Sequence, residues 1–316
     1  AMRLLGVVSD SDLRRAMLTG AGLNDEVAEF MVQNPIVGLA DESEQCLLEY
    51  MREASVYQLP LVDQNGCLRG LRRIDDFLQR SRQNNLVVLM AGGPGTRLYP
   101  LTKSLPKPLL PIHGRPLLTI LLDSIKNVGF HNIAVAVNYK REMIKAELAK
   151  TPRYRNVSYI EEDERLGTAG ALSLLPSVPD APVIVINGDI LTHLDYRALL
   201  DFHISGGHQL TAAIRRECVS IPYGVVNLDG DHILDIEEKP EKYYFANAGV
   251  YVIEPSVIAS IPKGEYFDMT TLIELCLAEE MVVGGFPIHE YWADIGQHKD
   301  LARAKEDYFE HFEASV

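Results

Sequence analysis

The sequence predicts an α/β protein, with a doubly wound, mostly parallel sheet in residues 83–316 preceded by a small α+β segment in residues 1–82. Two observations carry this prediction. From residue 86 onward, short β-branched segments alternate with segments of helical periodicity. These apolar segments end in glycine or polar residues, as buried parallel strands do where they open onto loops. The rhythm changes at QRSRQNN (79–85), where we place the domain boundary.

The first segment contains a short internal repeat. LLGVVSDSDLRRAM (4–17) and CLRGLRRIDDFLQR (67–80) both have the pattern of a strand, a polar turn and a helix. Between them we expect helices over 24–32 and 43–54, then a hairpin in which Asn65-Gly66 favours a tight turn. This order resembles a CBS domain. Residues 24–80 match one nearly complete motif and residues 2–20 match the tail of a preceding one, so the pair is truncated.

The CBS resemblance implies an adenosine nucleotide held by a Ser/Thr-x-x-Asp turn. Ser9 and Asp12 match that turn, whereas the second copy has Arg73 in place of the hydroxyl and keeps only Asp76. The alternative is that both aspartates are ordinary helix N-caps and that the segment mediates dimerisation. We therefore expect a homo-oligomer.

The second segment is predicted to alternate strands and helices before becoming more antiparallel. Its Asp-Gly turn indicates a hairpin within residues 224–240. The expected strands are 85–90, 132–139, 157–162, 182–189 and 247–255, and the expected helices are 116–128, 140–149, 168–175 and 298–312. A sheet of this kind binds ligands at the carboxyl ends of its strands.

Composition excludes several classes of function. The formal net charge is −14 with no basic stripe, which argues against nucleic acid or an anionic membrane as the main partner. Four scattered cysteines lack C-x-x-C or metal spacing, which favours reduced thiols in a cytoplasmic protein over structural zinc. The apolar segments are of strand length, and we expect neither a transmembrane helix nor a signal peptide.

The stretch MAGGPGTRLYPLTKSLPKP (90–108) predicts a phosphate site. It is not a P-loop, because none of its glycines is followed directly by Lys-Ser or Lys-Thr at the required spacing. It fits a dinucleotide fingerprint poorly, because Leu98 stands where a third glycine belongs. The glycine loop instead carries Arg97, and Lys107 follows between two prolines. Two cations at one anion-binding loop indicate a polyphosphate ligand.

Two carboxylates suit a divalent cation. Asp189 ends the strand PVIVINGD, and Asp294 lies in YWADIG. Together with phosphate oxygens they would suit Mg²⁺, which takes few protein ligands and keeps several waters. Either aspartate taken alone would be interpreted as a cap or turn residue, and the pair is what indicates a metal.

In order along the chain, GGPGTR, LPKP, LGTAGAL, NGD, EEKP, NAG and WADIG resemble the motifs of the sugar-1-phosphate nucleotidyltransferases over residues 86–312. The resemblance implies a Rossmann-like core that joins a nucleoside triphosphate to a sugar 1-phosphate and releases pyrophosphate, using Mg²⁺. It also implies roles for individual residues. The triphosphate would be contacted by Gly92, Gly93, Gly95, Thr96 and Arg97, and Arg97 and Lys107 would be catalytic. The remaining nucleotide contacts would come from Glu162, Gly167 and Thr168, the metal ligands would be Asp189 and Asp294, and the sugar phosphate would be bound by Glu238, Lys239 and Asn247.

The nucleobase is predicted from Glu162, which lies five residues before Gly167. In the family this position approaches the base, and a carboxylate, which only accepts hydrogen bonds, suits the two adjacent N–H donors of guanine. We therefore expect GTP. A CBS segment fused before such an enzyme is also a domain order that resembles guanylyltransferases of bacterial surface-glycan synthesis. The alternatives are a solvated acidic loop at Glu162, a dTTP-, UTP- or CTP-dependent enzyme, or a non-catalytic sensor of nucleotide sugars.

Overall fold

The computed structural model describes residues 3–22, 24–74, 83–308, 310 and 312. The chain divides into two compact units, residues 1–82 and 83–316. This division falls within QRSRQNN (79–85), where the domain boundary was placed from the sequence. Each unit is described by itself.

In its described residues, the first unit has a three-stranded sheet with one helix packed on it. The strand order is β1-β2-β3, with β1 parallel to β2 and β3 antiparallel to β2. Leu47 and Met51 pack on Leu59 and Leu61 to form its small core. The elements are α1 (Asp10–Leu18), η1 (Val27–Glu29), β1 (Gly38–Leu39), α2 (Glu44–Glu53), β2 (Gln58–Val62) and β3 (Leu68–Arg73).

One expectation for this unit needs correction. The helix expected over 24–32 is only the single turn η1, because the backbone of Val32 pairs with Val7 through two hydrogen bonds of 2.8 and 3.0 Å and is drawn out of any helix. Ser9 and Asp12 form a capping box at the start of α1, with the Ser9 hydroxyl accepting from the Asp12 N–H. The helix expected after β3, with Asp76, lies outside the described residues.

The second unit is built on a central sheet in the order β15-β11-β14-β9-β4-β7-β8 within the described residues. All neighbouring pairs are parallel except the two made by β14. The fold class expected for this part is confirmed. The strands are β4 (Val87–Met90), β7 (Ile133–Val137), β8 (Ser158–Glu161), β9 (Val183–Asn187), β11 (Leu210–Ser220), β14 (Glu241–Ile253) and β15 (Val283–Ile288).

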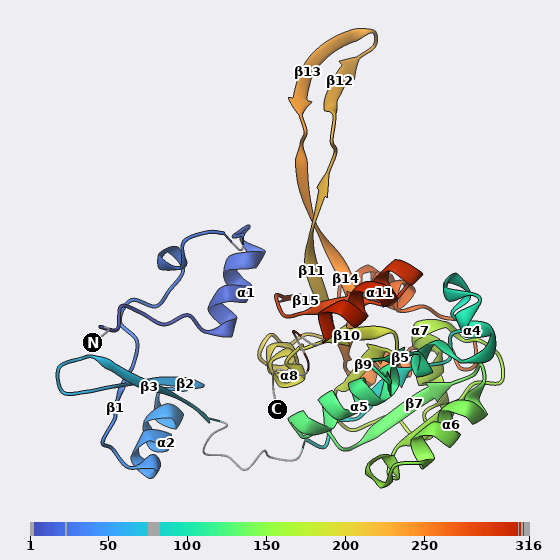
Figure 1. Cartoon of the computed structure of the whole chain (residues 1–316), viewed down its shortest axis with the longest axis horizontal. Helices are drawn as coiled ribbons and strands as arrows, with labels where there is room; N and C mark the ends of the chain where they lie inside the picture. Colours follow the sequence, from blue (N-terminus) through green and yellow to red (C-terminus); the bar gives the residue numbers. More distant parts are fainter. Residues whose placement is uncertain (1–2, 23, 75–82, 309, 311, 313–316) are drawn as a thin grey trace. The chain divides into compact units, whose positions relative to one another are not determined.

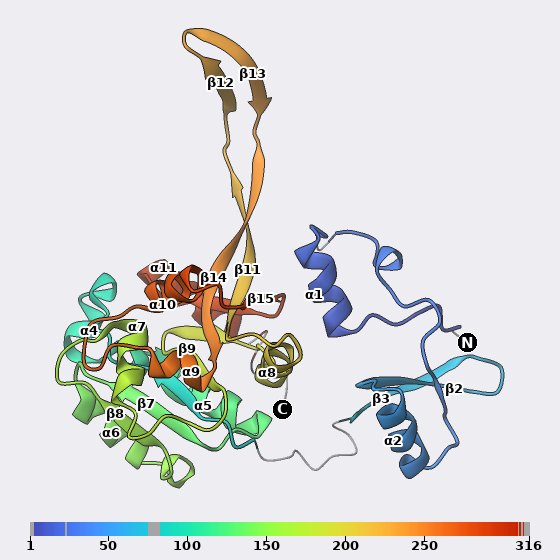
Figure 2. The ribbon, with the colours of Figure 1, turned by 180° about the vertical axis from the view of Figure 1, so that it is seen from behind.

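Helices cover both faces of this sheet (Figures 1 and 2), because successive strand residues point to opposite sides. Val87 and Leu89 face one core with α5, α6 and α8, while Val88 faces the other with α7, η5, α9 and α10. The elements are α5 (Leu117–Val128), α6 (Arg141–Ala149), α7 (Gly167–Gly170), η5 (Ala171–Leu174), α8 (Tyr196–Ser205), α9 (Pro255–Ala259), α10 (Met269–Ala278) and α11 (His298–Tyr308).

The helix expected over 168–175 is a single α turn, α7, followed by the 3₁₀ segment η5. Glycines at both ends of GTAG disfavour a longer α-helix, so the segment tightens. Shorter elements connect the rest: η2 (Thr96–Leu98), α4 (Leu101–Ser104), η3 (Lys107–Leu109), β5 (Pro111–Ile112), β6 (Arg115–Pro116), η4 (Pro152–Tyr154), β10 (Ile190–Thr192) and β16 (Trp292–Asp294).

A long hairpin projects from the sheet of the second unit, drawn in yellow and orange in Figure 1. β11 and β14 continue their antiparallel pairing beyond the sheet, out to Ser220↔Glu241, and the chain between them forms the hairpin of β12 (Gly224–Asp229) and β13 (His232–Glu238). We call residues 215–246 the hairpin arm. The strand expected over 247–255 therefore begins six residues earlier, at Glu241.

The four cysteines carry no disulfide. Of the helices described, none is both long and apolar enough to cross a membrane.

Candidate active site

Two parallel strands bring the glycine loop beside the NGD turn. β4 and β9 are neighbours, with Met90 opposite Asn187, so their carboxyl ends open at the same edge of the sheet. There the Gly188 N–H donates to the Met90 carbonyl at 2.9 Å. A Cβ on Gly188 would lie 2.5 Å from that carbonyl oxygen, so the approach requires glycine.

The glycine loop is shaped by Gly95, which has a φ of 62° and precedes η2. A Cβ there would lie 3.0 Å from the Cβ of Lys107 and from Cγ2 of Thr102, whose hydroxyl donates to the Gly95 carbonyl at 2.8 Å. Leu98 is fully buried, which explains why leucine replaces a third glycine. Gly93, Thr96 and Arg97 stay exposed at the start of η2.

Lys107 and Asp189 form an ion pair at this edge. Lys107 begins η3 and is buried, and its Nζ lies 2.5 Å from Oδ2 of Asp189. The prolines on either side restrict the backbone on which this lysine is held. A buried ammonium is thus aimed at the carboxylate that ends β9.

Asp294 reaches the same place through a different pair of strands. β10 and β16 pair with Ile190 opposite Asp294, and the Ile295 N–H donates to the Asp189 carbonyl at 2.9 Å. Desolvation raises the pKa of Asp294, the Asp189 carboxylate raises it further, and the charges of Lys107 and Arg97 oppose both effects. The structure therefore brings together Arg97, Lys107, Asp189 and Asp294 as the sequence predicted.

Asp300, which sequence reasoning missed, lies at the same cluster. Its charge also raises the pKa of Asp294, and its Oδ2 accepts from the Gln297 N–H at 2.8 Å. A Cβ on Gly296 would lie 3.2 Å from an Asp294 oxygen and 3.5 Å from Arg97 Nη1. A possible sequence signal was an aspartate in the first turn of a helix, which normally indicates only a cap.

The residues at this edge fit a magnesium ion. Asp189 and Asp294 are close enough for one charge to raise the pKa of the other, and a divalent cation would relieve that repulsion. The nearby Asn187 Oδ1 is buried and has no hydrogen-bond partner. All three supply oxygen donors, the type that Mg²⁺ prefers.

Glu162 lies beneath the glycine loop and is 4% exposed. Its Oε2 accepts from the Leu166 N–H at 3.0 Å, and its Oε1 lies 2.7 Å from where a Cβ on Gly92 would stand. Burial raises the pKa of this carboxyl, and the Leu166 N–H and the charge of Arg165 oppose the shift. The alternative of a solvated acidic loop fits its neighbour Asp163, which is exposed, but does not fit Glu162.

The LGTAG turn is held by Asp268, a residue that sequence reasoning missed. Its Oδ1 accepts from the N–H and hydroxyl of Thr168 at 3.0 and 3.2 Å, while the Thr168 hydroxyl also accepts from the Met269 N–H. Burial would raise the pKa of Asp268, but hydrogen bonds from Tyr266 and Thr168 lower it overall. Gly167, with a φ of 83°, sits against this segment. Thr168 is thus engaged in shaping the turn.

Asn247 lies near the carboxylates, but Glu238 and Lys239 do not. Asn247 donates to the Tyr251 hydroxyl at 2.8 Å, and burial raises the pKa of Tyr251 to about 12, with a contribution from Asp189. Glu238 ends β13 and Lys239 follows it, and both are exposed on the hairpin arm. Glu241, where the paired strand begins, is already ~20 Å along the strand from Asn247 at about 3.3 Å per residue.

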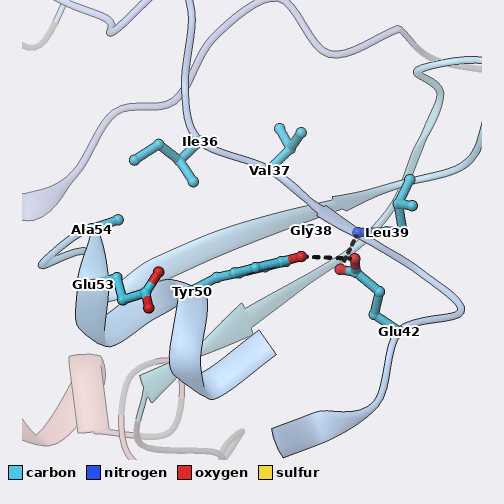
Figure 3. Close-up of a pocket in the computed structure, with 8 residues that line it drawn as sticks. All are labelled: Ile36, Val37, Gly38, Leu39, Glu42, Tyr50, Glu53 and Ala54. Carbon is cyan, nitrogen blue, oxygen red and sulfur yellow. Dashed lines mark hydrogen bonds between the residues drawn. The ribbon is translucent and has the colours of Figure 1, made fainter. Parts of the chain in front are cut away.

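A separate cavity of about 550 Å³ lies in the first unit (Figure 3), where an adenosine nucleotide was considered. Its lining is mainly apolar, and Glu42 accepts there from the Leu39 N–H and the Tyr50 hydroxyl. Its acidic lining residues are Glu42 and Glu53, and its described lining contains no lysine or arginine. A nucleotide phosphate would meet no cation there.

Comparison with known proteins agrees with this geometry. A family model described as nucleotidyl transferase matches residues 86–311. The mannose-1-phosphate guanyltransferase of Pichia angusta is 36% identical over 228 residues, covering 68% of this chain and 61% of that protein. The enzyme of the same name from Saccharomyces cerevisiae is 33% identical over 225 residues, covering 68% and 62%. The chain spans less than two thirds of the length of these relatives.

Among solved structures, HddC from Yersinia pseudotuberculosis complexed with GMP-PN is 28% identical, with a TM-score of 0.56. The match covers 71% of this chain and 99% of that one. The chain belongs to the nucleotidyl transferase family, and residues 86–311 carry the match.

Proposed function

We propose that this chain is a Mg²⁺-dependent sugar-1-phosphate nucleotidyltransferase that uses GTP. The observation that carries the proposal is the ion pair of the buried Lys107 with Asp189, with Asp294 beside it and the glycine loop adjoining. An anion-binding loop, a fixed ammonium and a pair of carboxylates are the parts that phosphoryl-group chemistry requires. We place the sugar phosphate at the same edge, beside Asn247, whose amide donates to the Tyr251 hydroxyl.

The reaction requires positioning and charge neutralisation rather than a general base, because a sugar phosphate is already ionised near neutral pH. An oxygen of the sugar phosphate forms a bond to the α-phosphorus of the nucleotide, and the bond from that phosphorus to the bridging oxygen breaks, so that pyrophosphate leaves with its electron pair. Arg97 and the N–H groups of the glycine loop bind the triphosphate, and Lys107 neutralises charge developing at the α-phosphate. Bound Mg²⁺, held by Asp189 and Asp294, would supply further positive charge to phosphate oxygens.

GTP is favoured as the donor by Glu162 and by the comparisons. Glu162 Oε1 faces the glycine loop and remains an acceptor, which suits the N–H groups of guanine. The curated relatives are named for guanyl transfer to mannose 1-phosphate, and the solved relative was crystallised with GMP-PN. Mannose 1-phosphate is therefore the first acceptor to test. Free thiols and an acidic chain agree with a cytoplasmic enzyme.

Two alternatives remain, namely another nucleoside triphosphate as donor and a non-catalytic sensor of nucleotide sugars. Both are tested by measuring pyrophosphate release with Mg²⁺ across GTP, dTTP, UTP, CTP and ATP, each paired with several sugar 1-phosphates. The proposal expects the highest kcat/KM with GTP. Turnover only with another triphosphate would refute the base assignment, and no release with any pair would favour the sensor.

The first unit is proposed to be a CBS segment that assists assembly. The capping box engages Ser9 and Asp12 with each other, and the mainly apolar lining of the cavity in this unit has glutamates as its charged residues. Both observations weigh against adenosine nucleotide binding.

A further inference from the structure

Lys140 occupies a backbone position that suits other residue types better. It is the N-cap of α6, with a φ of 52° and a ψ of 38° in the left-handed region, and its side chain makes no capping hydrogen bond to that helix. Glycine and asparagine adopt this backbone at lower cost and are also favoured at N-caps, where a lysine has no acceptor to offer. Residues that break such local rules are commonly kept for a contact elsewhere.

The ammonium of Lys140 binds the end of a different helix, α4. Its Nζ donates to the carbonyl of Lys103 at 2.7 Å and to the carbonyl of Ser104 at 3.0 Å. These are the last two residues of α4. The C-terminus of a helix presents carbonyl oxygens that carry partial negative charge, so an ammonium placed there is stabilising. Lys140 therefore caps α4 rather than its own helix.

The carbonyls of α4 depend on partners from outside because the helix is short. In a helix of four residues every carbonyl belongs to the last turn and lacks a partner within the helix. The Leu101 carbonyl accepts from the Leu105 N–H at 3.4 Å, just beyond the helix, and the Thr102 carbonyl accepts from the Tyr139 hydroxyl at 3.2 Å. Since Lys140 binds the other two, the residues that follow β7 supply partners for three of the four carbonyls.

The helix α4 in turn holds the glycine loop. Thr102 is fully buried, and its hydroxyl donates to the Gly95 carbonyl at 2.8 Å. A Cβ on Gly95 would lie 3.0 Å from Thr102 Cγ2, so the loop and the helix are in close contact. At the start of the loop, the Tyr139 N–H donates to the Gly92 carbonyl at 3.3 Å. The residues after β7 are therefore bonded to the loop directly at Gly92 and through α4 at Gly95.

The same short segment also contacts the residue proposed to select the base. β7 lies beside β4 and parallel to it, so both strands open at the same edge of the sheet. There the Asn138 amide donates to the Glu162 carbonyl at 2.8 Å, and the Asn138 Cβ lies 3.3 Å from where a Cβ on Gly92 would stand. Asn138, Tyr139 and Lys140 thus contact Glu162, the glycine loop and α4 in succession.

We propose that Lys140 is a positioning residue for nucleotide binding, which caps α4 and thereby holds the glycine loop in the form that receives the triphosphate. A loop that is organised before the nucleotide arrives does not have to be ordered by binding, which strengthens affinity. The role explains why a lysine is kept at a left-handed N-cap. The effect on nucleotide affinity rests on the proposed function, whereas the capping of α4 does not.

The test uses Lys140→Asn in the full chain, which removes the ammonium and supplies a residue that suits a left-handed N-cap. Calorimetric titration with GTP and Mg²⁺, without a sugar phosphate, should show the Kd for GTP raised by about five-fold or more, as expected if the loop is organised in about a fifth of the molecules. The denaturation midpoint should stay at the wild-type value, because the new residue favours the N-cap of α6. Lys140→Arg can still donate to both carbonyls and should keep the Kd within about two-fold of the wild type.

The matched control is Lys150→Asn at the other end of α6, where the ammonium pairs with Glu147 of the same helix, and its Kd for GTP should not change. In pyrophosphate release, Lys140→Asn should raise the KM for GTP and leave kcat near the wild-type value, because bound triphosphate organises the loop at saturation. A wild-type Kd in Lys140→Asn, equal losses in the two asparagine variants, or an arginine variant as weak as Lys140→Asn would overturn the proposal.

A second measurement does not depend on any substrate. In the nucleotide-free chain, amide hydrogen exchange over residues 92–104 should be faster in Lys140→Asn than in the wild type and unchanged in Lys150→Asn. If the wild-type chain binds no nucleoside triphosphate, the proposed function has failed, and hydrogen exchange alone decides whether Lys140 holds the loop. Exchange that is unchanged over these residues in Lys140→Asn would then overturn the positioning role.

Discussion

Replacing Glu162 by Gln tests how the nucleobase is chosen. One oxygen of Glu162 accepts from the Leu166 N–H, and the other faces Gly92 in the glycine loop. In the variant, the amide oxygen would keep the bond to Leu166, which places the NH₂ group on the side of the glycine loop. A guanine N–H would then meet a donor instead of an acceptor.

A mismatched buried donor costs about 1–3 kcal/mol. Because about 1.4 kcal/mol corresponds to a ten-fold change, the ratio of kcat/KM for GTP over dTTP or UTP should fall by about ten-fold or more. The assay is pyrophosphate release with each triphosphate. The control is Glu161→Gln, because Glu161 is exposed and pairs with Lys145 on the outer surface. An unchanged ratio with normal overall activity would refute the role of Glu162.

The same substitution predicts a change in the pH dependence of stability. Burial raises the folded-state pKa of Glu162 above its ordinary value of 4.5, so the folded chain holds this proton more tightly than the unfolded chain. The contribution of this bound proton to the free energy of unfolding is fully present below pH 4.5 and is lost as pH rises through the folded-state pKa. Glu162→Gln lacks this loss, so its free energy of unfolding relative to the wild type should rise with pH. Denaturant titrations at several pH values measure it, and a flat difference would contradict it.

Three further predictions follow from the same geometry. Lys107→Ala should lower kcat by about 100-fold or more in pyrophosphate release. Arg97→Lys should not keep wild-type activity, because an ammonium cannot reproduce the guanidinium fork. Near-normal turnover in both variants would contradict the proposed mechanism. Gly188→Ala should lower the free energy of unfolding, because its Cβ would lie 2.5 Å from the Met90 carbonyl; an unchanged denaturation midpoint would show that this approach is not required. Removing residues 1–82 should leave a folded, active transferase with an altered oligomeric state, and loss of folded protein would show a shared core.

The sequence could predict the site residues that lie at strand ends. A β-branched segment running into glycine fixes where a parallel strand opens, and β4 and β9 place Gly92 and Asp189 at one edge for that reason. Asp294 was predicted as a metal ligand from its residue type and by resemblance, not from a strand-end pattern. Its position depends on the pairing of β10 with β16, which no local pattern reveals.

Other contacts depend on tertiary structure that the sequence pattern does not contain. Asp268 looks like a helix cap in sequence, yet its carboxylate accepts from Thr168, 100 residues away. The length of β14 was missed because KYYF follows a lysine-proline pair that indicates a turn, whereas its register with β11 continues through it. That extension separates Lys239 from the other predicted ligands.

The most direct test of the central claim is the Mg²⁺ dependence of pyrophosphate release from GTP and mannose 1-phosphate, compared between the wild type and Asp294→Asn. The account predicts no turnover in EDTA, saturable recovery with Mg²⁺, and a requirement for about ten-fold more Mg²⁺ in the variant because one of two carboxylates is lost. Wild-type turnover in EDTA, or the same Mg²⁺ requirement in both proteins, would contradict the assignment of Asp189 and Asp294 as the metal site.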